Sequence, residues 1–256
     1  AASDVYKRQQ YRRIESFPLL VTPFATLLNG FVTYQPSMTR QASYRMVARY
    51  NAPAQFVGEQ AYQTEVNYTI RKGTSVQLNY SNITTLEGEA LFEEQFIQID
   101  HKFSKSFKAK LGLQRIFYNQ NVYENHEDYP DVKTFTPFME LTYKLNRKNS
   151  IRFESQYLST KQDLGSFYNG ILEWNSSPKF TIALSQMINT EPQRQSSQLL
   201  TKRVLYYPGF FVKYNVGTTS FTAAYVKQVE GVNCTGGICR LEPAFSGLRF
   251  TLSTQF

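Results

Sequence analysis

The segment FTPFMELTYKLNRKNSIRFESQY, residues 135–157, decides the fold. Apolar side chains recur at alternate positions on both sides of Arg147, as at Tyr143 and Leu145. Such alternation is typical of a strand with one apolar and one polar face. Residues 147–149, Arg-Lys-Asn, leave room only for a tight turn. The segment therefore predicts two antiparallel strands joined as a hairpin.

The same alternation recurs along the chain, and no helical period of comparable length accompanies it. Many of the runs reach ten residues or more. That is the length a tilted membrane strand needs, whereas soluble strands average about five to six residues. The predicted strands are 43–51, 58–71, 74–82, 91–103, 107–118, 134–146, 150–160, 167–175, 179–189, 203–214, 219–229 and 246–256.

The length of 256 residues fits one large β domain as well as two small ones. No run approaches the roughly 20 apolar residues of a membrane helix, which excludes a helical membrane protein but not a β-barrel. The 18 Tyr, 20 Phe and 1 Trp favour strands and suit the aromatic girdles of a membrane barrel. The net charge of +8 permits an anionic partner. The positive residues are spread through strands and turns without a basic run, so nucleic acid is not an expected partner.

The connections between the predicted strands alternate in length. The short ones are 71–74, 104–106, 147–149, 176–178 and 215–218, and the long ones are 83–90, 119–133, 190–202 and 230–245. Outer-membrane barrels have tight turns on the periplasmic side and longer loops outside. A soluble sandwich has no reason to sort its loops in this way. Every tight turn falls on the same side as Phe256, which favours the barrel.

Charged residues lie within the strands, in phase with the polar positions. In a soluble sandwich they would face water, and in a membrane barrel they would line the lumen. Strand length, aromatic content and loop sorting favour the second arrangement. We predict an all-β, up-and-down antiparallel transmembrane β-barrel with about twelve strands, to which further N-terminal strands could belong. Its predicted lumen charges are Lys108, Lys110, Glu140, Lys144, Arg152, Glu154, Lys213 and Arg249.

The N-terminal residues need separate treatment. Residues 4–9, DVYKRQ, resemble a translated sequencing adapter, so residues 1–9 are expected to be a scar. Residues 10–256 are expected to form a single outer-membrane β-barrel domain, the C-terminal part of a longer protein. No strand is assigned within residues 10–42, although Asn29-Gly30 is a hairpin-turn signal.

The end of the chain resembles a known family. Phe256 closes an apolar series at alternate positions, and it resembles the terminal aromatic that the barrel-assembly machinery reads. Residues 232–243, VNCTGGICRLEP, are similar to the tail of Bacteroidetes-type outer-membrane barrels grouped in a family of unknown function. The stretch from Ser43 to Gly73 resembles that family more loosely. The resemblance implies a barrel in the bacterial outer membrane, in contact with its lipids, and implies no activity.

The two cysteines, Cys234 and Cys239, lie in the last long loop around Gly236-Gly237. A disulfide is the default in an oxidising compartment, and the glycines permit the bend that brings the two Cα atoms together. So small a ring removes little chain entropy, so the bond is expected to fix the shape of the loop. A redox or metal pair is the alternative, but two thiolates without a nearby histidine form half of a metal site.

No catalytic, cofactor or metal site is predicted. His101 falls on a strand, and His126 lies in an acidic loop that is expected to be solvated. No phosphate loop, paired zinc motif or nucleotide fingerprint is present, which leaves an outer-membrane hydrolase as a remote alternative. The first expectation is passage of small polar solutes through the charged lumen. The alternative is a surface scaffold or anchoring protein that binds a partner through loops 119–133, 190–202 and 230–245. An open lumen favours the first function, and a filled one favours the second.

Overall fold

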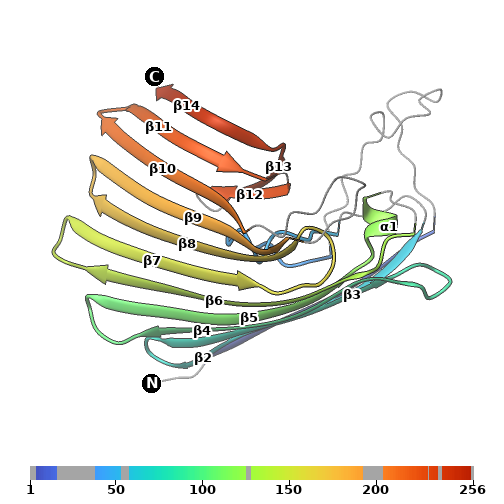
Figure 1. Ribbon diagram of the computed structural model, residues 1–256. Coiled ribbons are helices and arrows are strands. Elements are labelled where there is room, and N and C mark those ends of the chain that lie inside the picture. The colour runs from blue at the N-terminus through green and yellow to red at the C-terminus, as the bar shows by residue number, and fades with distance from the viewer. Residues whose placement is uncertain are drawn as a thin grey trace.

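The computed structural model describes residues 4–15, 38–52, 58–124, 128–192, 204–229, 231–235 and 238–254. Twelve strands form one antiparallel sheet in which each strand pairs with the next along the chain. A separate two-stranded hairpin precedes the last strand of the sheet. The sheet curls into a trough (Figure 1), and its edge strands β1 and β14 are not joined, so the fold is barrel-like without being closed.

The strands are long, and the structure contains little helix. The only helix in the described part of the chain is α1 (Gln120–Tyr123), which is far too short to cross a membrane. The hairpin consists of β12 (Gly231–Thr235) and β13 (Ile238–Glu242), of which the backbone alone is described. The strands of the sheet are β1 (Asp4–Ile14), β2 (Glu59–Arg71), β3 (Thr74–Thr84), β4 (Ala90–Lys102), β5 (Phe107–Tyr118), β6 (Val132–Lys144), β7 (Asn149–Leu158), β8 (Gly165–Ser176), β9 (Phe180–Pro192), β10 (Leu205–Val216), β11 (Thr219–Gln228) and β14 (Phe245–Thr254).

Connection length is sorted between the two ends of the trough. We call one end the tight-turn rim; its connections are 72–73, 103–106, 145–148, 177–179 and 217–218. We call the other end the loop rim; its connections are 15–58, 85–89, 119–131, 159–164, 193–204 and 229–244. Gly73 has φ +88° and Gly217 has φ +56°, in the left-handed region that a glycine adopts without steric cost in such short turns.

Eleven of the twelve predicted strands are present, with ends that differ by a few residues. The predicted strand 43–51 is wrong, because this segment forms turns and a bend. Its backbone closes on itself, since the Ala48 amide donates to the Tyr44 carbonyl at 2.9 Å. Strand β1 and the hairpin within the last long loop were not predicted.

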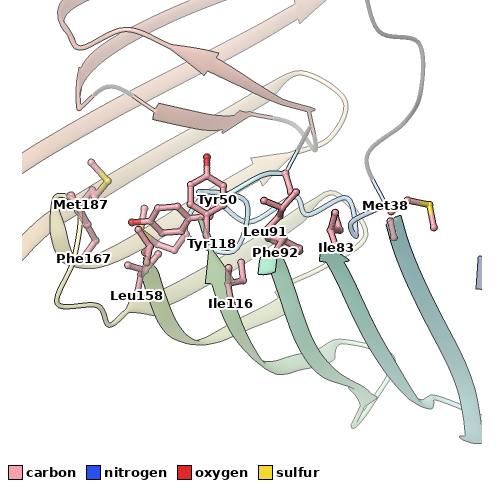
Figure 2. Close-up of a cluster of buried hydrophobic side chains, with 14 residues drawn as sticks. Met38, Tyr50, Ile83, Leu91, Phe92, Ile116, Tyr118, Leu158, Phe167 and Met187 are labelled. Atoms are coloured by element: carbon pink, nitrogen blue, oxygen red, sulfur yellow. The ribbon is translucent and has the colours of Figure 1, made fainter. Parts of the chain in front are cut away.

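The inner segment, residues 38–52, lies in the trough and forms the core with the concave face of the sheet. Its Met46 and Tyr50 are 1% and 5% exposed. They belong to a cluster with residues from the loop-rim ends of the strands, which Figure 2 shows below Tyr50. The strand residues of this cluster include Ile83, Leu91, Phe92, Ile116, Tyr118, Leu158, Phe167 and Met187. Burying this apolar surface stabilises the inner segment against the wall.

A second apolar contact depends on a missing side chain. Gly112 on β5 pairs with Phe138 on β6, and the Phe138 ring lies across the glycine. The ring centroid of Phe138 is 4.7 Å from that of Tyr44 and 5.8 Å from that of Phe96. A Cβ atom at residue 112 would lie 2.2 Å from Cζ of Phe138, which no packed structure tolerates. Glycine therefore makes the space for the ring that supports the inner segment.

We expect Gly112→Ala to destabilise the protein by about 1–3 kcal/mol, the usual cost of overpacking. The free energy of unfolding in urea measures this change. As a control, the cost of Gly112→Ala is measured both in the native protein and in a Phe138→Leu background. The closest contact of the added Cβ atom would be with the ring, and its 2.9 Å contact with the Ile97 carbonyl oxygen would persist in both backgrounds, so Gly112→Ala should cost less, though still something, in the Phe138→Leu background than beside the native Phe138. Equal costs in the two backgrounds would contradict this packing.

Candidate functional site

A charged network occupies the concave face near the middle of β6, β7 and β8. The Arg152 guanidinium lies 2.6 Å from Glu154 Oε2, 2.9 Å from Glu173 Oε2 and 3.4 Å from Glu140 Oε2. Lys110 Nζ approaches Glu140 Oε1 at 3.5 Å. The three carboxylate side chains are between 6% and 21% exposed. Charges this far from water persist because they are paired.

The network continues into the inner segment and forms the first anchor between this segment and the sheet. The Tyr44 hydroxyl donates to Glu140 Oε2 at 3.2 Å. Gln156 donates to Glu154 and accepts from the Met46 amide at 2.7 Å. Burial, reinforced by the charge of Glu140, raises the pKa of Tyr44 far above its ordinary value. Its hydroxyl therefore stays neutral and continues to donate.

A second anchor joins the inner segment to β4. Glu94 is 2% exposed and accepts from Asn79 at 3.0 Å and from Gln114 at 2.7 Å. The backbone amide of Arg40 donates to the same carboxylate at 3.4 Å. The Arg40 guanidinium lies 4.0 Å from Glu94 and 3.6 Å above the ring of Phe96. A cation over an aromatic face is attracted by the ring quadrupole, which adds to the ion pair.

A third anchor joins the inner segment to the connection between β7 and β8. The Tyr50 hydroxyl donates to Asp163 Oδ2 at 2.8 Å, and Arg49 lies 3.2 Å from the same oxygen. The Arg49 guanidinium also lies 4.9 Å from the ring centroid of Phe167. Burial raises the pKa of Tyr50 far above its ordinary value, so its hydroxyl remains a donor. The three anchors hold the inner segment along the wall from β4 to β8.

The pairing register places all eight predicted lumen residues on the concave face. Lys110, Glu140, Arg152 and Glu154 are brought together in the network described above. The other four lie elsewhere on that face. Lys108 and Lys144 are exposed at the tight-turn rim, and Lys213 lies between Thr181 and Thr222 of the neighbouring strands. The Arg249 guanidinium is 5.5 Å from the centroid of the Phe245 ring.

The predicted residues near the C-terminus are less completely described. Cys234 and Cys239 are directly opposite each other in the β12–β13 register, and their side chains lie outside the described atoms. Phe256 lies outside the described residues. His126 does so as well, whereas His101 Nδ1 lies 2.8 Å from the Thr74 hydroxyl on β3. Among the described residues, no group of three His, Cys, Asp or Glu side chains could hold a metal ion.

Sequence reasoning missed the inner segment and its acceptors Glu94 and Asp163. One signal could have revealed it: Tyr44 and Val47, and likewise Met46 and Tyr50, are three and four residues apart rather than two. This spacing is typical of helical turns, and all four side chains are buried. Glu173, which completes the Arg152 network, could not be selected without knowing the register between β7 and β8.

The convex face has the opposite character. Leu248, Phe250 and Leu252 of β14 are 66%, 74% and 64% exposed. Large apolar side chains are also exposed on this face of the central strands, among them Leu78, Ile97, Ile99, Leu111, Leu172, Leu184 and Phe210. Monomeric soluble proteins rarely expose a contiguous apolar surface above a few hundred Å². The convex face thus exposes many large apolar side chains along the central and last strands.

Aromatic residues border the aliphatic band of the convex face at both rims. Those toward the loop rim are Tyr62, Tyr80, Phe135, Tyr157 and Tyr206, and those toward the tight-turn rim are Phe103, Phe107, Tyr143, Trp174, Phe180 and Tyr214. Neighbouring rings touch, as in Phe103–Phe107 with centroids 5.2 Å apart and Phe180–Tyr214 with centroids 4.5 Å apart. Tyr214 is eight residues beyond Tyr206, about 27 Å along the strand, which corresponds to about 19–22 Å of height at the 35–45° tilt of a membrane strand. A membrane barrel carries an apolar band of about 25 Å between its aromatic girdles.

The edge strand β1 departs from this pattern. Lys7 pairs with Val66 and Arg13 pairs with Gln60, so cations share the convex face with apolar residues. Charges on an edge strand discourage pairing with another chain. The first half of β1 is formed by residues 4–9, whose origin as an adapter scar stays a prediction.

These features define the class of the protein: an all-β, up-and-down, barrel-like sheet with charged residues inside and apolar residues outside. The chain belongs to a family described as a family of unknown function (DUF6029), which matches residues 6–256. No curated protein matches the chain.

Arg152→Gln removes the cation that Glu140, Glu154 and Glu173 share. Removing one partner of a buried ion pair costs about 3–5 kcal/mol, and partial solvent access reduces the expected loss to about 2–4 kcal/mol. The free energy of unfolding in urea at neutral pH measures the loss. Lys144→Gln, which removes an exposed cation from the same face, is the control and should change stability by less than about 0.5 kcal/mol. Similar losses in the two variants would show that the network contributes nothing.

Proposed function

We propose that the protein is an outer-membrane β-barrel protein that acts as a surface scaffold, with its convex face in lipid. The observation that carries this proposal is the segregation of side chains: exposed apolar residues on the convex face and paired charges on the concave face. A soluble sheet protein packs its apolar face inside. Only a membrane barrel is stabilised by the reverse arrangement.

Strand geometry supports a membrane location. The strands of the sheet are 10–13 residues long, and a transmembrane strand tilted by about 45° needs about 9–11 residues. The sorting of short and long connections agrees with an outer-membrane orientation in which the loop rim faces outward. The resemblance of residues 232–243 to Bacteroidetes-type barrels points to the same compartment.

The open edges set a requirement. Backbone groups in lipid need partners, so β1 and β14 must be joined in the working barrel. Twelve alternating strands leave β1 and β14 antiparallel to each other. They can therefore pair directly or through an even number of further strands.

The filled interior favours a scaffold over a channel. The inner segment engages Glu94, Glu140, Gln156 and Asp163 of the wall, so these groups do not line an open path. A porin of the solute-passing kind needs a water-filled lumen. The interior provides no reacting nucleophile–base pair either, so hydrolase chemistry has no support from the described residues.

The described residues of connection 119–131, at the loop rim, form a surface suited to a partner. Asn119 accepts from the Val122 amide at 3.2 Å and donates to Glu89 at 3.1 Å, which ties α1 to the connection before β4. Asn121 donates to the Tyr129 carbonyl at 2.8 Å and accepts from the Tyr129 amide at 2.9 Å. A loop held by its own side chains loses little conformational entropy on binding. We propose that this connection contributes to the surface that recognises the partner.

We also propose that Cys234 and Cys239 form a disulfide. Directly opposed residues of an antiparallel pair have Cα atoms about 4.5–5.5 Å apart, within the range that a disulfide spans. We expect the purified protein, denatured without reductant, to show no reactive thiol and to be lighter by two hydrogens than its reduced form. Reductant should then expose both thiols. Two free thiols before reduction would contradict the bond.

Trp174 tests the membrane location directly. It is the single tryptophan of the chain, lies on the convex face and is 38% exposed. In vesicles of zwitterionic lipid, we expect its emission to shift to the blue and to be quenched when the acyl chains are brominated. Quenching by a soluble agent such as acrylamide should fall at the same time. Emission that stays typical of water, with no quenching by brominated lipid, would contradict insertion.

A matched pair of variants extends this experiment to the two faces. In a Trp174→Phe background, Leu184→Trp places the reporter on the convex face, where Leu184 is 54% exposed. Thr181→Trp places it on the concave face of the same strand, opposite Lys213. Brominated lipid should quench the tryptophan at residue 184 and leave that at residue 181 nearly unquenched. Equal quenching at the two positions would overturn the assignment of faces.

A further inference from the structure

Cations cluster at the tight-turn rim: four of its five connections carry or adjoin them, the connection 217–218 does not, and Asp4 at the start of β1 is a described carboxylate at this end of the sheet. Nine cationic residues lie in or beside its connections: Arg71, Lys72, Lys102, Lys105, Lys108, Lys144, Arg147, Lys148 and Lys179. All nine are exposed. The five connections and their flanking residues, 71–74, 102–108, 144–149, 176–180 and 216–219, contain no Asp or Glu. The rim therefore carries a net positive charge, which is concentrated from β2 to β9.

These cations are not neutralised within the protein. None of the nine forms an ion pair with a carboxylate in the part of the chain that the structure describes. Three connections of the loop rim are together acidic. Connections 85–89, 119–131 and 159–164 carry Glu87, Glu89, Glu124, Asp128, Asp131 and Asp163 among their described residues, against Lys161. These three connections thus differ in sign from those of the tight-turn rim.

The fold gathers charges that the sequence separates. Lys72, Lys105, Lys148 and Lys179 are about 30–45 residues apart along the chain, which is why they appear scattered. Antiparallel hairpins bring each of them to the same end of the sheet. The aromatic row of this rim lies beside them, and Phe103 and Phe180 adjoin Lys102 and Lys179 in sequence. Aromatic rings with Lys and Arg at one level are the usual composition at a membrane–water interface.

We propose that the tight-turn rim binds the phosphate headgroups of anionic phospholipids in the adjacent leaflet. This inference rests on the proposed membrane location and adds which lipid class the rim recognises. The cations follow the circumference of the sheet at one level instead of converging on a cleft. Such an arrangement fits a flat charged surface better than a single soluble anion or a polymer strand. A basic residue near an anionic membrane is attracted by a force that salt weakens within a Debye length.

Trp174 serves as the reporter, since it lies on β8 close to this rim and pairs with Ile151 next to the β6–β7 turn. The full chain is inserted into vesicles of phosphatidylcholine with about one third phosphatidylglycerol, and either lipid is brominated in turn. The ratio of the two quenching efficiencies gives the local enrichment of the anionic lipid. We expect an enrichment of at least about threefold at low salt, from the attraction of several cations, and its loss at high salt.

Two triple variants separate the rim from net charge. Lys105→Gln, Lys148→Gln and Lys179→Gln together should bring the enrichment close to one. Lys133→Gln, Lys161→Gln and Lys227→Gln together remove the same charge from exposed positions toward the loop rim and should leave it unchanged. Equal effects of the two triple variants, or no enrichment in the native protein, would overturn the proposal.

Two further outcomes are distinct. Absence of quenching by either brominated lipid means that the protein has not inserted, which contradicts the proposed function rather than the lipid preference. Soluble polyphosphate is added as a competitor to the native protein in the mixed vesicles. Chloride of equal total charge, at the same ionic strength, is the control. If polyphosphate abolishes the enrichment and chloride does not, the rim prefers a polymer, and the assignment to lipid is wrong.

Discussion

The pleat of the strands is the constraint on which the rest of the structure depends. Successive side chains of a strand point to opposite faces, so one register decides the polarity of both surfaces. Here the register places Arg152 and Glu154 in the trough and Phe153 outside it. Charges can be buried when they are paired, whereas apolar side chains in contact with water have an unfavourable free energy of hydration. The arrangement is therefore consistent only with a surface covered by something apolar.

The polar groups on the concave face of the sheet need hydrogen-bond partners, and the strands alone do not provide all of them. Glu94 and Gln156 each accept a backbone amide of the inner segment, and Asp163 accepts a hydroxyl from it. The segment in turn buries Met46 and Tyr50 against the strand ends. Wall and segment thus stabilise each other. Because the anchors extend from β4 to the β7–β8 connection, loss of one leaves the others in place.

The features that could be predicted from the sequence are those that depend on residues close together in the chain. Alternation predicted eleven strands and which residues within a strand share a face, because both follow from a period of two along a single strand. The inner segment was predicted wrongly as a strand, since its fold depends on contacts such as Met46–Gln156, 110 residues apart. Strand β1 has too few apolar residues to alternate, and the hairpin strands have five residues each, too few to show a period. Glu173 enters the Arg152 network only through a register that no local pattern contains.

Charge is sorted along the trough as well as across the sheet. In the middle, Lys110 and Arg152 face three glutamates at ion-pair distance, so the interior is close to neutral. The rims are less balanced: connections 85–89 and 119–131 of the loop rim are acidic among their described residues, and the tight-turn rim is mostly basic. Like charges held at one level repel one another, and folding brings them closer than they are in the extended chain. At the tight-turn rim nine described cations stand against the carboxylate of Asp4, which offsets only part of this repulsion. An anionic surface outside the protein would relieve the rest, which is the physical reason to look for one at that end.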